Sequence, residues 1–126
     1  MLLLRMIPRP TLTFAANDMI AFGALLAFRE AGLHCPEDIS LIGFDNLQFA
    51  EMTSPPLSSV SQPGFQMGTT AARILIERVR GDNGPAKHIV LETALKIRDS
   101  VAPPSKSQAQ PTSSRIASLS ITRRAK

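Results

Sequence analysis

The sequence predicts an α/β fold with a largely parallel sheet flanked by helices, and three observations carry this prediction. Short apolar runs of strand length alternate with two segments of helical periodicity, an order that favours a parallel sheet. The run at residues 39–44 is almost continuously apolar, which is typical of a strand covered on both faces. Polar pairs follow the first two runs, with Asn17 beside Asp18 and Asp45 beside Asn46.

The first strand is predicted at residues 12–15 and the first helix at residues 19–31. Asn17 or Asp18 can cap the free N–H groups at the start of the helix, and Gly32 suits the left-handed position after its end. The helix has apolar residues almost all round its axis, a pattern of helices buried on more than one side. Contact with a second subunit and burial inside one domain both explain this pattern.

The remaining elements continue the alternation of strands and helices. They are a turn at residues 36–38, a strand at 39–44, a short helical segment within 47–54, a strand at 57–61, a helix at 64–80, a loop at 81–85 and a strand at 88–97. Gly68 and Ala71 are small, so we expect the second helix to approach its neighbour closely. The chain divides into residues 1–10, the remnant of an upstream helix and a linker, then a body at 11–104 and a disordered basic tail at 105–126.

The basic charge of the chain belongs to this tail and not to the body. The formal net charge is +4, but residues 1–104 carry nine cations against ten acids. A neutral body gives no indication of a nucleic-acid surface. Cys35 is the one cysteine, so no intramolecular disulfide can form. No secretion signal or membrane-spanning stretch is recognisable, and we expect a cytoplasmic location.

Catalytic and metal-binding patterns are not recognisable in the sequence. His34 and His88 have no matched nucleophile in an elbow motif, no phosphate-binding loop is present, and the spacing of carboxylates and histidines fits neither zinc nor calcium. An acid–base pair of Asp18 and Asp45 is the enzymatic alternative. We expect no enzyme, no cofactor and no metal site.

The two polar pairs stand where open α/β sheets bind ligands, outside the carboxyl ends of the strands. A carboxylate accepts hydrogen bonds from hydroxyl groups, and an Asn side chain both donates and accepts. Together, Asn17, Asp18, Asp45 and Asn46 suit a polyhydroxylated ligand. The residues alone leave open the common alternative that they serve as turn and cap residues.

Eight segments carry a resemblance to a known family. They are residues 13–25 (TFAANDMIAFGAL), 32–33 (GL), 36–40 (PEDIS), 42–46 (IGFDN), 56–57 (PL), 62–63 (QP), 67–68 (MG) and 98–100 (RDS). In this order and spacing they resemble the effector domain of the lactose-repressor/galactose-repressor (LacI/GalR) family of transcriptional regulators. The resemblance covers residues 11–104 and implies a partial lobe of a type I periplasmic-binding-protein-like fold.

The resemblance also implies roles for individual residues. Asn17 and Asp45 match family positions that contact a sugar-like effector, and Asp18 and Phe44 lie beside them. The segment near Gln62 and Pro63 matches a strand that crosses between the two lobes of the effector domain.

A dimer interface is implied as well. The helix at residues 19–31 and the segment after residue 46 resemble the family's interface in the C-terminal lobe. We expect Phe22, Leu26, Phe49 and Met52 to make this contact, in a homodimer or in a heterodimer with a full-length repressor.

Complete family members begin with a helix-turn-helix and an N-terminal lobe, and neither is recognisable in this sequence. The chain is therefore expected to be a fragment of a repressor, with DNA contacts made only by the missing N-terminal domain and without a membrane partner. The alternatives are a solute-binding protein of a sugar transporter and a nonfunctional or dominant-negative remnant. Strands missing from the sheet would leave an apolar edge uncovered, so we expect low stability in isolation.

Overall fold

The structure of the chain, a computed structural model, describes residues 6–104. Its elements in chain order are β1 (Leu12–Phe14), α1 (Asp18–Glu30), β2 (Ser40–Asp45), the 3-10 helix η2 (Gln48–Glu51), β3 (Ser58–Ser61), α2 (Gly64–Val79) and β4 (Ala94–Lys96). Four strands form one sheet in the order β1-β2-β3-β4. The first three are parallel and β4 is antiparallel to β3, which confirms the predicted α/β fold with a largely parallel sheet.

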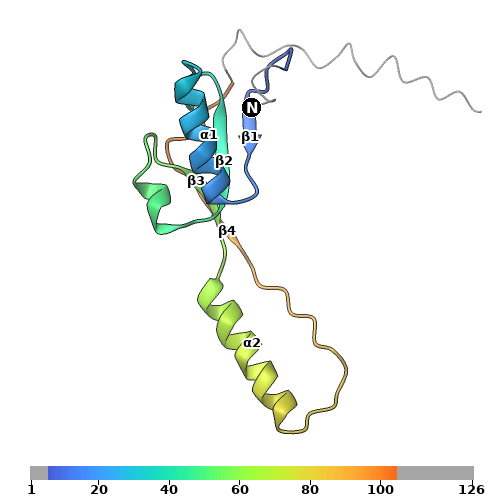
Figure 1. Cartoon of the computed structure of the whole chain (residues 1–126). Helices are drawn as coiled ribbons and strands as arrows, with labels where there is room; N and C mark the ends of the chain where they lie inside the picture. Colours follow the sequence, from blue (N-terminus) through green and yellow to red (C-terminus); the bar gives the residue numbers. More distant parts are fainter. Residues whose placement is uncertain (1–5, 105–126) are drawn as a thin grey trace, which may run out of the picture.

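Helix α1 covers one face of the sheet (Figure 1). Asn17 caps its first turn by accepting a hydrogen bond from the Ile20 N–H at 2.8 Å, as the sequence predicts. Gly32 follows the end of the helix with a φ of +70°, a conformation that glycine adopts at no steric cost. The core lies between α1 and the sheet, and its buried apolar residues are Ala15, Ala21, Ala24, Phe28, Ile39, Leu41, Ala50 and Leu57.

The opposite face of the sheet is open in the part of the chain that the structure describes. Phe14 is 58% exposed and Leu12 is 48% exposed, while Ile42 and Phe44 are half-buried. The rings of Phe14 and Phe44 meet edge to face with their centroids 6.4 Å apart. The prediction that residues 39–44 are covered on both faces is therefore wrong for this part of the chain, because α1 packs on one side only.

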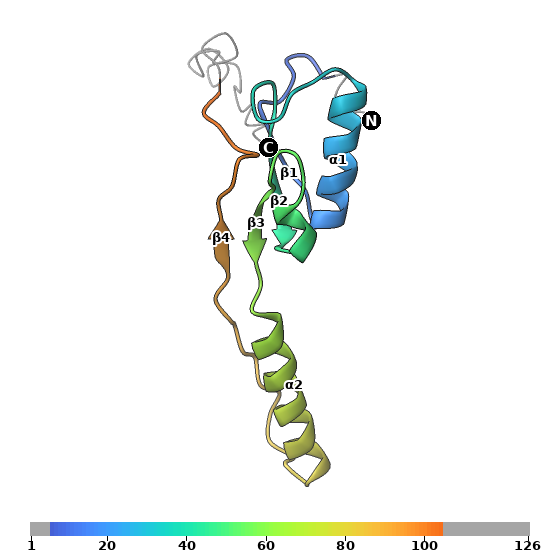
Figure 2. The ribbon, with the colours of Figure 1, turned by 90° about the vertical axis from the view of Figure 1, so that its left-hand side faces the viewer.

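Helix α2 stands away from the sheet and buries none of its residues (Figures 1 and 2). Phe65 is 88% exposed, and a Cβ placed on Gly68 would meet no atom within 4 Å. The expected close approach of this helix to a neighbour is therefore not found among the described residues. The chain returns beside α2 without regular structure until β4, which is shorter than the strand predicted at 88–97.

The loop after α2 is tied to the helix by charged side chains. Arg78 donates to the carbonyl oxygens of Asp82, Gly84 and Pro85. Lys87 contacts Glu77 at 2.7 Å and Asp82 at 3.3 Å. The hydrogen bond from Lys87 lowers the pKa of Glu77, the Gly84 N–H and then Lys87 lower the pKa of Asp82, and the bond to Glu77 raises the pKa of Lys87.

The two ends of the chain carry predictions that the structure does not test. Residues 6–11 contain no helix, and the first five residues of the segment 1–10, predicted to be a remnant of an upstream helix and a linker, lie outside the described range. The tail predicted at 105–126 also lies outside it. In residues 6–104 there is no helix of sufficient length and apolar character to cross a membrane.

Candidate functional site

The carboxyl ends of the three parallel strands meet at one edge of the sheet, which we call the carboxyl edge. Asn17 follows β1, Asp45 and Asn46 lie at the end of β2, and Gln62 follows β3. The strand register places Asp45 opposite Ser61, so these polar residues come from neighbouring positions. This is the location at which open α/β sheets bind ligands.

The turn at Asp45 and Asn46 has an unusual backbone that the surrounding residues hold in place. Both residues have positive φ values, 108° and 53°, and residues other than glycine adopt such values infrequently. The Asn46 N–H donates to Ser59 Oγ at 3.0 Å, and Gln62 Nε2 donates to Asp45 Oδ1 at 2.6 Å. A strained backbone fixed by specific hydrogen bonds is a common feature of ligand sites.

Asp18 lies beneath this turn and not at the open edge. Its side chain is fully buried, Oδ1 accepts from Ser59 Oγ at 2.6 Å, and Oδ2 accepts from the Leu47 N–H at 2.7 Å. The ligand-contacting position expected for Asp18 is therefore not the one that the structure gives it, because both carboxylate oxygens face protein donors. For the same reason Asp18 is not placed as the partner of Asp45 in an acid–base pair.

Gly43 makes room for the buried carboxylate. A Cβ at this position would lie 2.1 Å from Asp18 Oδ1 and 3.0 Å from Leu57 Cδ2, distances at which atoms overlap. The glycine in the IGFDN segment is therefore needed for space. Because residue 43 has no side chain, the Asp18 carboxylate can pack against the end of β2 and hold the turn that follows it.

Asn17 and Asp45 both keep polar atoms available at the carboxyl edge. Asn17 uses Oδ1 as the helix cap, and no described residue accepts from its Nδ2 group. Asp45 uses Oδ1 for Gln62, while its Oδ2 has no hydrogen-bond partner among residues 6–104. An amide donor and a carboxylate acceptor remain to bind a ligand, so the cap function of Asn17 and a ligand function are compatible.

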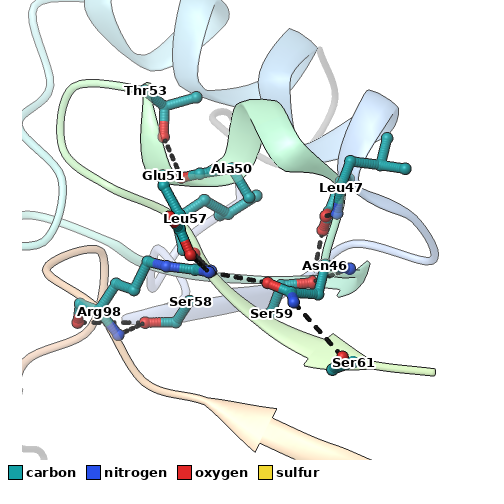
Figure 3. Close-up of polar contacts among 11 residues, drawn as sticks. Asn46, Leu47, Ala50, Glu51, Thr53, Leu57, Ser58, Ser59, Ser61 and Arg98 are labelled. Atoms are coloured by element: carbon teal, nitrogen blue, oxygen red, sulfur yellow. Dashed lines mark hydrogen bonds and ion pairs between the residues drawn. The ribbon is translucent and has the colours of Figure 1, made fainter. Parts of the chain in front are cut away.

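Two residues of the site, Gln62 and Arg98, were missed by the sequence prediction, and the contacts through which Asn46 holds the turn were not predicted. Gln62 holds Asp45, and Asn46 links the turn to β3 through its Nδ2 bond to Ser61 Oγ at 3.3 Å. Arg98 donates to Asn46 Oδ1 at 2.8 Å from a segment 52 positions later in the chain (Figure 3). Gln62 was detectable as a polar residue after a predicted strand, but the contact of Arg98 depends on the folded path of the chain.

A shallow hollow of about 400 Å³ reaches the carboxyl edge at Gln62. It lies between α2 and the returning segment, and Thr70, Lys87, His88 and Leu91 are among its lining residues. Its volume is within the range of small-molecule sites. Gln62 therefore connects the Asp45 turn with this space.

Of the four residues expected at a dimer interface, two belong to α1 and two belong to η2 or its C-terminal cap. We call Phe22, Leu26, Phe49 and Met52 the partner surface. Phe22 and Leu26 line a hollow of about 220 Å³ together with Thr53 and Ser54. Phe49 is 63% exposed and Met52 is 71% exposed. Large apolar side chains exposed on adjacent elements are typical of a surface that binds a partner.

The remaining reactive side chains of residues 6–104 include no cluster that could hold a metal ion. In the described part of the chain, no three His, Cys, Asp or Glu side chains are grouped so as to hold a metal ion. Burial raises the pKa of Cys35 to about 11, and its Sγ lies 3.4 Å from the Ser100 carbonyl oxygen. A thiol in this environment is mostly protonated at neutral pH and is a poor nucleophile.

Comparisons with known proteins give one consistent result. The periplasmic binding protein-like domain family matches residues 2–101. The ribose operon repressor of Haemophilus influenzae is 38% identical over 93 residues, and the transcriptional repressor PurR of Photobacterium profundum is 42% identical over 93 residues. Each match covers 74% of this chain but 28% of the relative, so the chain spans little more than a quarter of the length of these curated relatives.

Solved structures agree with the sequence relatives. A LacI-family regulator from Enterococcus faecalis with bound ribose has a TM-score of 0.71 at 42% identity, covering 75% of this chain and 35% of that one. The complex of the regulator CelR with cellobiose has a TM-score of 0.69 at 39% identity, covering 71% of this chain and 28% of that one. A putative LacI regulator from Bacillus cereus reaches a TM-score of 0.76 at 33% identity, with 79% and 36% covered. The chain therefore belongs to the periplasmic binding protein-like domain family, and it corresponds to part of the effector domain of LacI-family transcriptional regulators.

Proposed function

We propose that this chain is the effector-sensing portion of a transcriptional repressor and that it binds a small sugar-like molecule at the carboxyl edge. The observation that carries the proposal is the Asp45 turn. Its carboxylate is held by Gln62 at 2.6 Å, and its second oxygen is available at the carboxyl edge, to which Asn17 also belongs. Carboxylate and amide groups at fixed positions are suited to binding vicinal hydroxyl groups.

The individual residues have separate roles in this proposal. Asn17 and Asp45 contact the ligand hydroxyl groups, and Gln62 orients Asp45. The half-buried ring of Phe44 supplies apolar surface beside them, together with Phe14 at 6.4 Å between ring centroids, since sugar sites combine a few polar groups with apolar walls. We assign Asp18 to positioning the turn from below.

The relatives support a sugar-like ligand and a regulatory function. Two of the similar solved regulators contain ribose and cellobiose, and the curated relatives are repressors, which favours a regulator over a solute-binding protein of a transporter. In a whole regulator, ligand binding would shift the effector domain between two states and so change the affinity for DNA. In this proposal the DNA contacts are made by the N-terminal domain of the whole regulator and not by this chain, and the location is cytoplasmic.

Titration calorimetry with D-ribose and with cellobiose tests the ligand site. Because the chain corresponds to only part of an effector domain, we expect weak but saturable binding of one of these sugars. Asp45→Ala should weaken it by at least about tenfold, since losing one charged hydrogen bond costs about 1.5–3 kcal/mol. Glu30→Gln is the matched control, because Glu30 is exposed at the far end of α1 and its substitution should leave binding unchanged. Equal affinities of the wild type and Asp45→Ala would exclude Asp45 as a ligand residue.

The same proposal assigns the partner surface to a dimer. Leu26, Phe49 and Met52 offer apolar area that residues 6–104 leave exposed, and Phe22 is half-buried beside the core. The partner is a second copy of this chain or the matching surface of a full-length repressor. Sedimentation velocity should show a dimer that Met52→Asp converts to a monomer, whereas Leu75→Asp on α2 should not. A wild-type chain that stays monomeric at high concentration would contradict this assignment.

A further inference from the structure

We propose that Arg98 is a positioning residue that links the carboxyl edge to the partner surface. This inference rests on the proposed function, which assigns a ligand to the carboxyl edge and a partner to the partner surface. The contacts of Arg98 that connect the two lie within this chain and do not depend on that assignment. Arg98 lies before the buried Ser100 in the RDS segment, and it contacts neither Asn17 nor the Asp45 carboxylate directly. Its effect on a ligand would pass through Asn46.

The backbone of Arg98 is fixed to the middle of the sheet. Its N–H donates to Ser58 Oγ at 2.8 Å, and the same hydroxyl donates to the Arg98 carbonyl oxygen at 3.1 Å. Ser58 belongs to β3 and is buried. The side chain of Arg98 therefore extends from a backbone position that two hydrogen bonds hold in place.

The guanidinium group joins the two ends of the segment from Asn46 to Glu51 and also contacts Leu57. Its NH2 nitrogen donates to Asn46 Oδ1 at 2.8 Å and to Glu51 Oε1 at 2.7 Å (Figure 3). Its NH1 nitrogen donates to the Leu57 carbonyl oxygen at 2.7 Å. A guanidinium is planar and its donors have a fixed relative geometry, so turning it to follow one acceptor changes the bond to the other.

One end of this link is the turn of the carboxyl edge. Asn46 directly follows Asp45, and its side-chain amide is held on both sides, by Arg98 at Oδ1 and by Ser61 at Nδ2. A ligand that pulls on the Asp45 carboxylate changes the turn and with it the orientation of the Asn46 amide. The guanidinium would then have to move with Oδ1 or lose that hydrogen bond.

The other end is η2, on the partner surface. Glu51 lies between Phe49 and Met52 and is 72% exposed, whereas the side chain of Arg98 is 14% exposed. A partner that binds on Phe49 and Met52 would fix η2 and exclude water from the ion pair of Arg98 and Glu51. The attraction between the two charges increases when the surrounding dielectric constant falls. Binding at the partner surface would then hold Asn46 in its present orientation, and the coupling would be reciprocal by linkage.

The test removes the exposed end of the link and observes the other end. In the ¹⁵N–¹H spectrum of the ligand-free chain, we expect Glu51→Ala to shift the side-chain amide signals of Asn46 and Gln62, with a smaller shift for Glu51→Gln, which keeps an acceptor. Gln48→Ala is the matched control, since Gln48 is exposed on the same 3-10 helix and should leave both signals unchanged. Shifts from Glu51→Ala confined to residues 48–55 would overturn the proposal.

The sugar titration adds a second readout that separates this proposal from the proposed function. If the wild-type chain binds D-ribose, Glu51→Ala should change the Kd by on the order of fivefold or more, the lower end of common coupling. An unchanged Kd together with unchanged Asn46 and Gln62 signals would refute the role of Arg98 and leave the sugar site intact. If the wild type binds no sugar, the proposed function fails, and the amide signals still decide whether Arg98 forms the link.

Discussion

Replacing the buried carboxylate with an amide, Asp18→Asn, should destabilise the fold without changing its shape. The carboxylate accepts from Ser59 Oγ at 2.6 Å and from the Leu47 N–H at 2.7 Å. An Asn of the same size has one acceptor oxygen, and its NH2 group faces the second donor. The variant therefore loses one charged hydrogen bond inside the protein, a change of about 1.5–3 kcal/mol in the free energy of unfolding.

Urea denaturation followed by circular dichroism measures this loss directly. In a thermal melt, the same loss of about 2 kcal/mol should lower the Tm by roughly 8–16 °C for a folded body of about 100 residues. Glu30→Gln, the same type of substitution on an exposed side chain, should change the free energy of unfolding by less than about 0.5 kcal/mol. A double-mutant cycle with Ser59→Ala should give a coupling of about 0.5–3 kcal/mol. Equal stability of Asp18→Asn and wild type would refute the assigned role of the carboxylate.

Three further predictions address other parts of the chain. Gly43→Ala should lower the free energy of unfolding by about 1–3 kcal/mol, the range for overpacking, and a urea midpoint equal to wild type would show that the strand end has spare room. An ion cluster of Glu77, Asp82 and Lys87 should protect the loop after α2 from hydrogen exchange at pH values above the usual carboxyl pKa. The protection should be lost as the pH falls through the lowered pKa values of the two carboxyl groups, and again as it rises through the raised pKa of Lys87. Exchange rates that change with pH only as the intrinsic chemistry of exchange requires would contradict a role of the cluster. Cys35 should react with iodoacetamide about 100-fold more slowly than a free cysteine at pH 8, because burial raises its pKa from 9.0 to about 11, and denaturation in urea should abolish the difference.

The strands and helices could be predicted from the sequence because their signals are local. Asn17 predicted the start of α1, Gly32 its end, and the apolar run before Asp45 became β2. The final strand was predicted too long, because alternation at residues 88–93 meets the condition for a strand without showing whether a partner strand is available. The sequence also did not predict that one face of the sheet is open among the described residues, since an apolar face does not specify which segment packs on it.

The candidate site was predictable at the level of its position and less so for single roles. The polar residues after each strand marked the carboxyl edge, and Asp45 lies there as expected. Asp18 adjoins Asn17 in sequence but points under the turn, because a residue in the first turn of a helix faces the sheet when it lies on the packed side of that helix. Arg98 reaches Asn46 across 52 positions, and no spacing rule within the sequence indicates such a contact.

The sugar site at the carboxyl edge is the central claim, and a ¹⁵N–¹H titration of the chain with D-ribose and with cellobiose tests it most directly. We predict saturable shifts at Asn17, Asp45 and Gln62 for one of the two sugars, and their loss in Asp45→Ala with the rest of the spectrum retained. Shifts that gather instead around Thr70 and His88, or a spectrum that neither sugar changes, would contradict the claim.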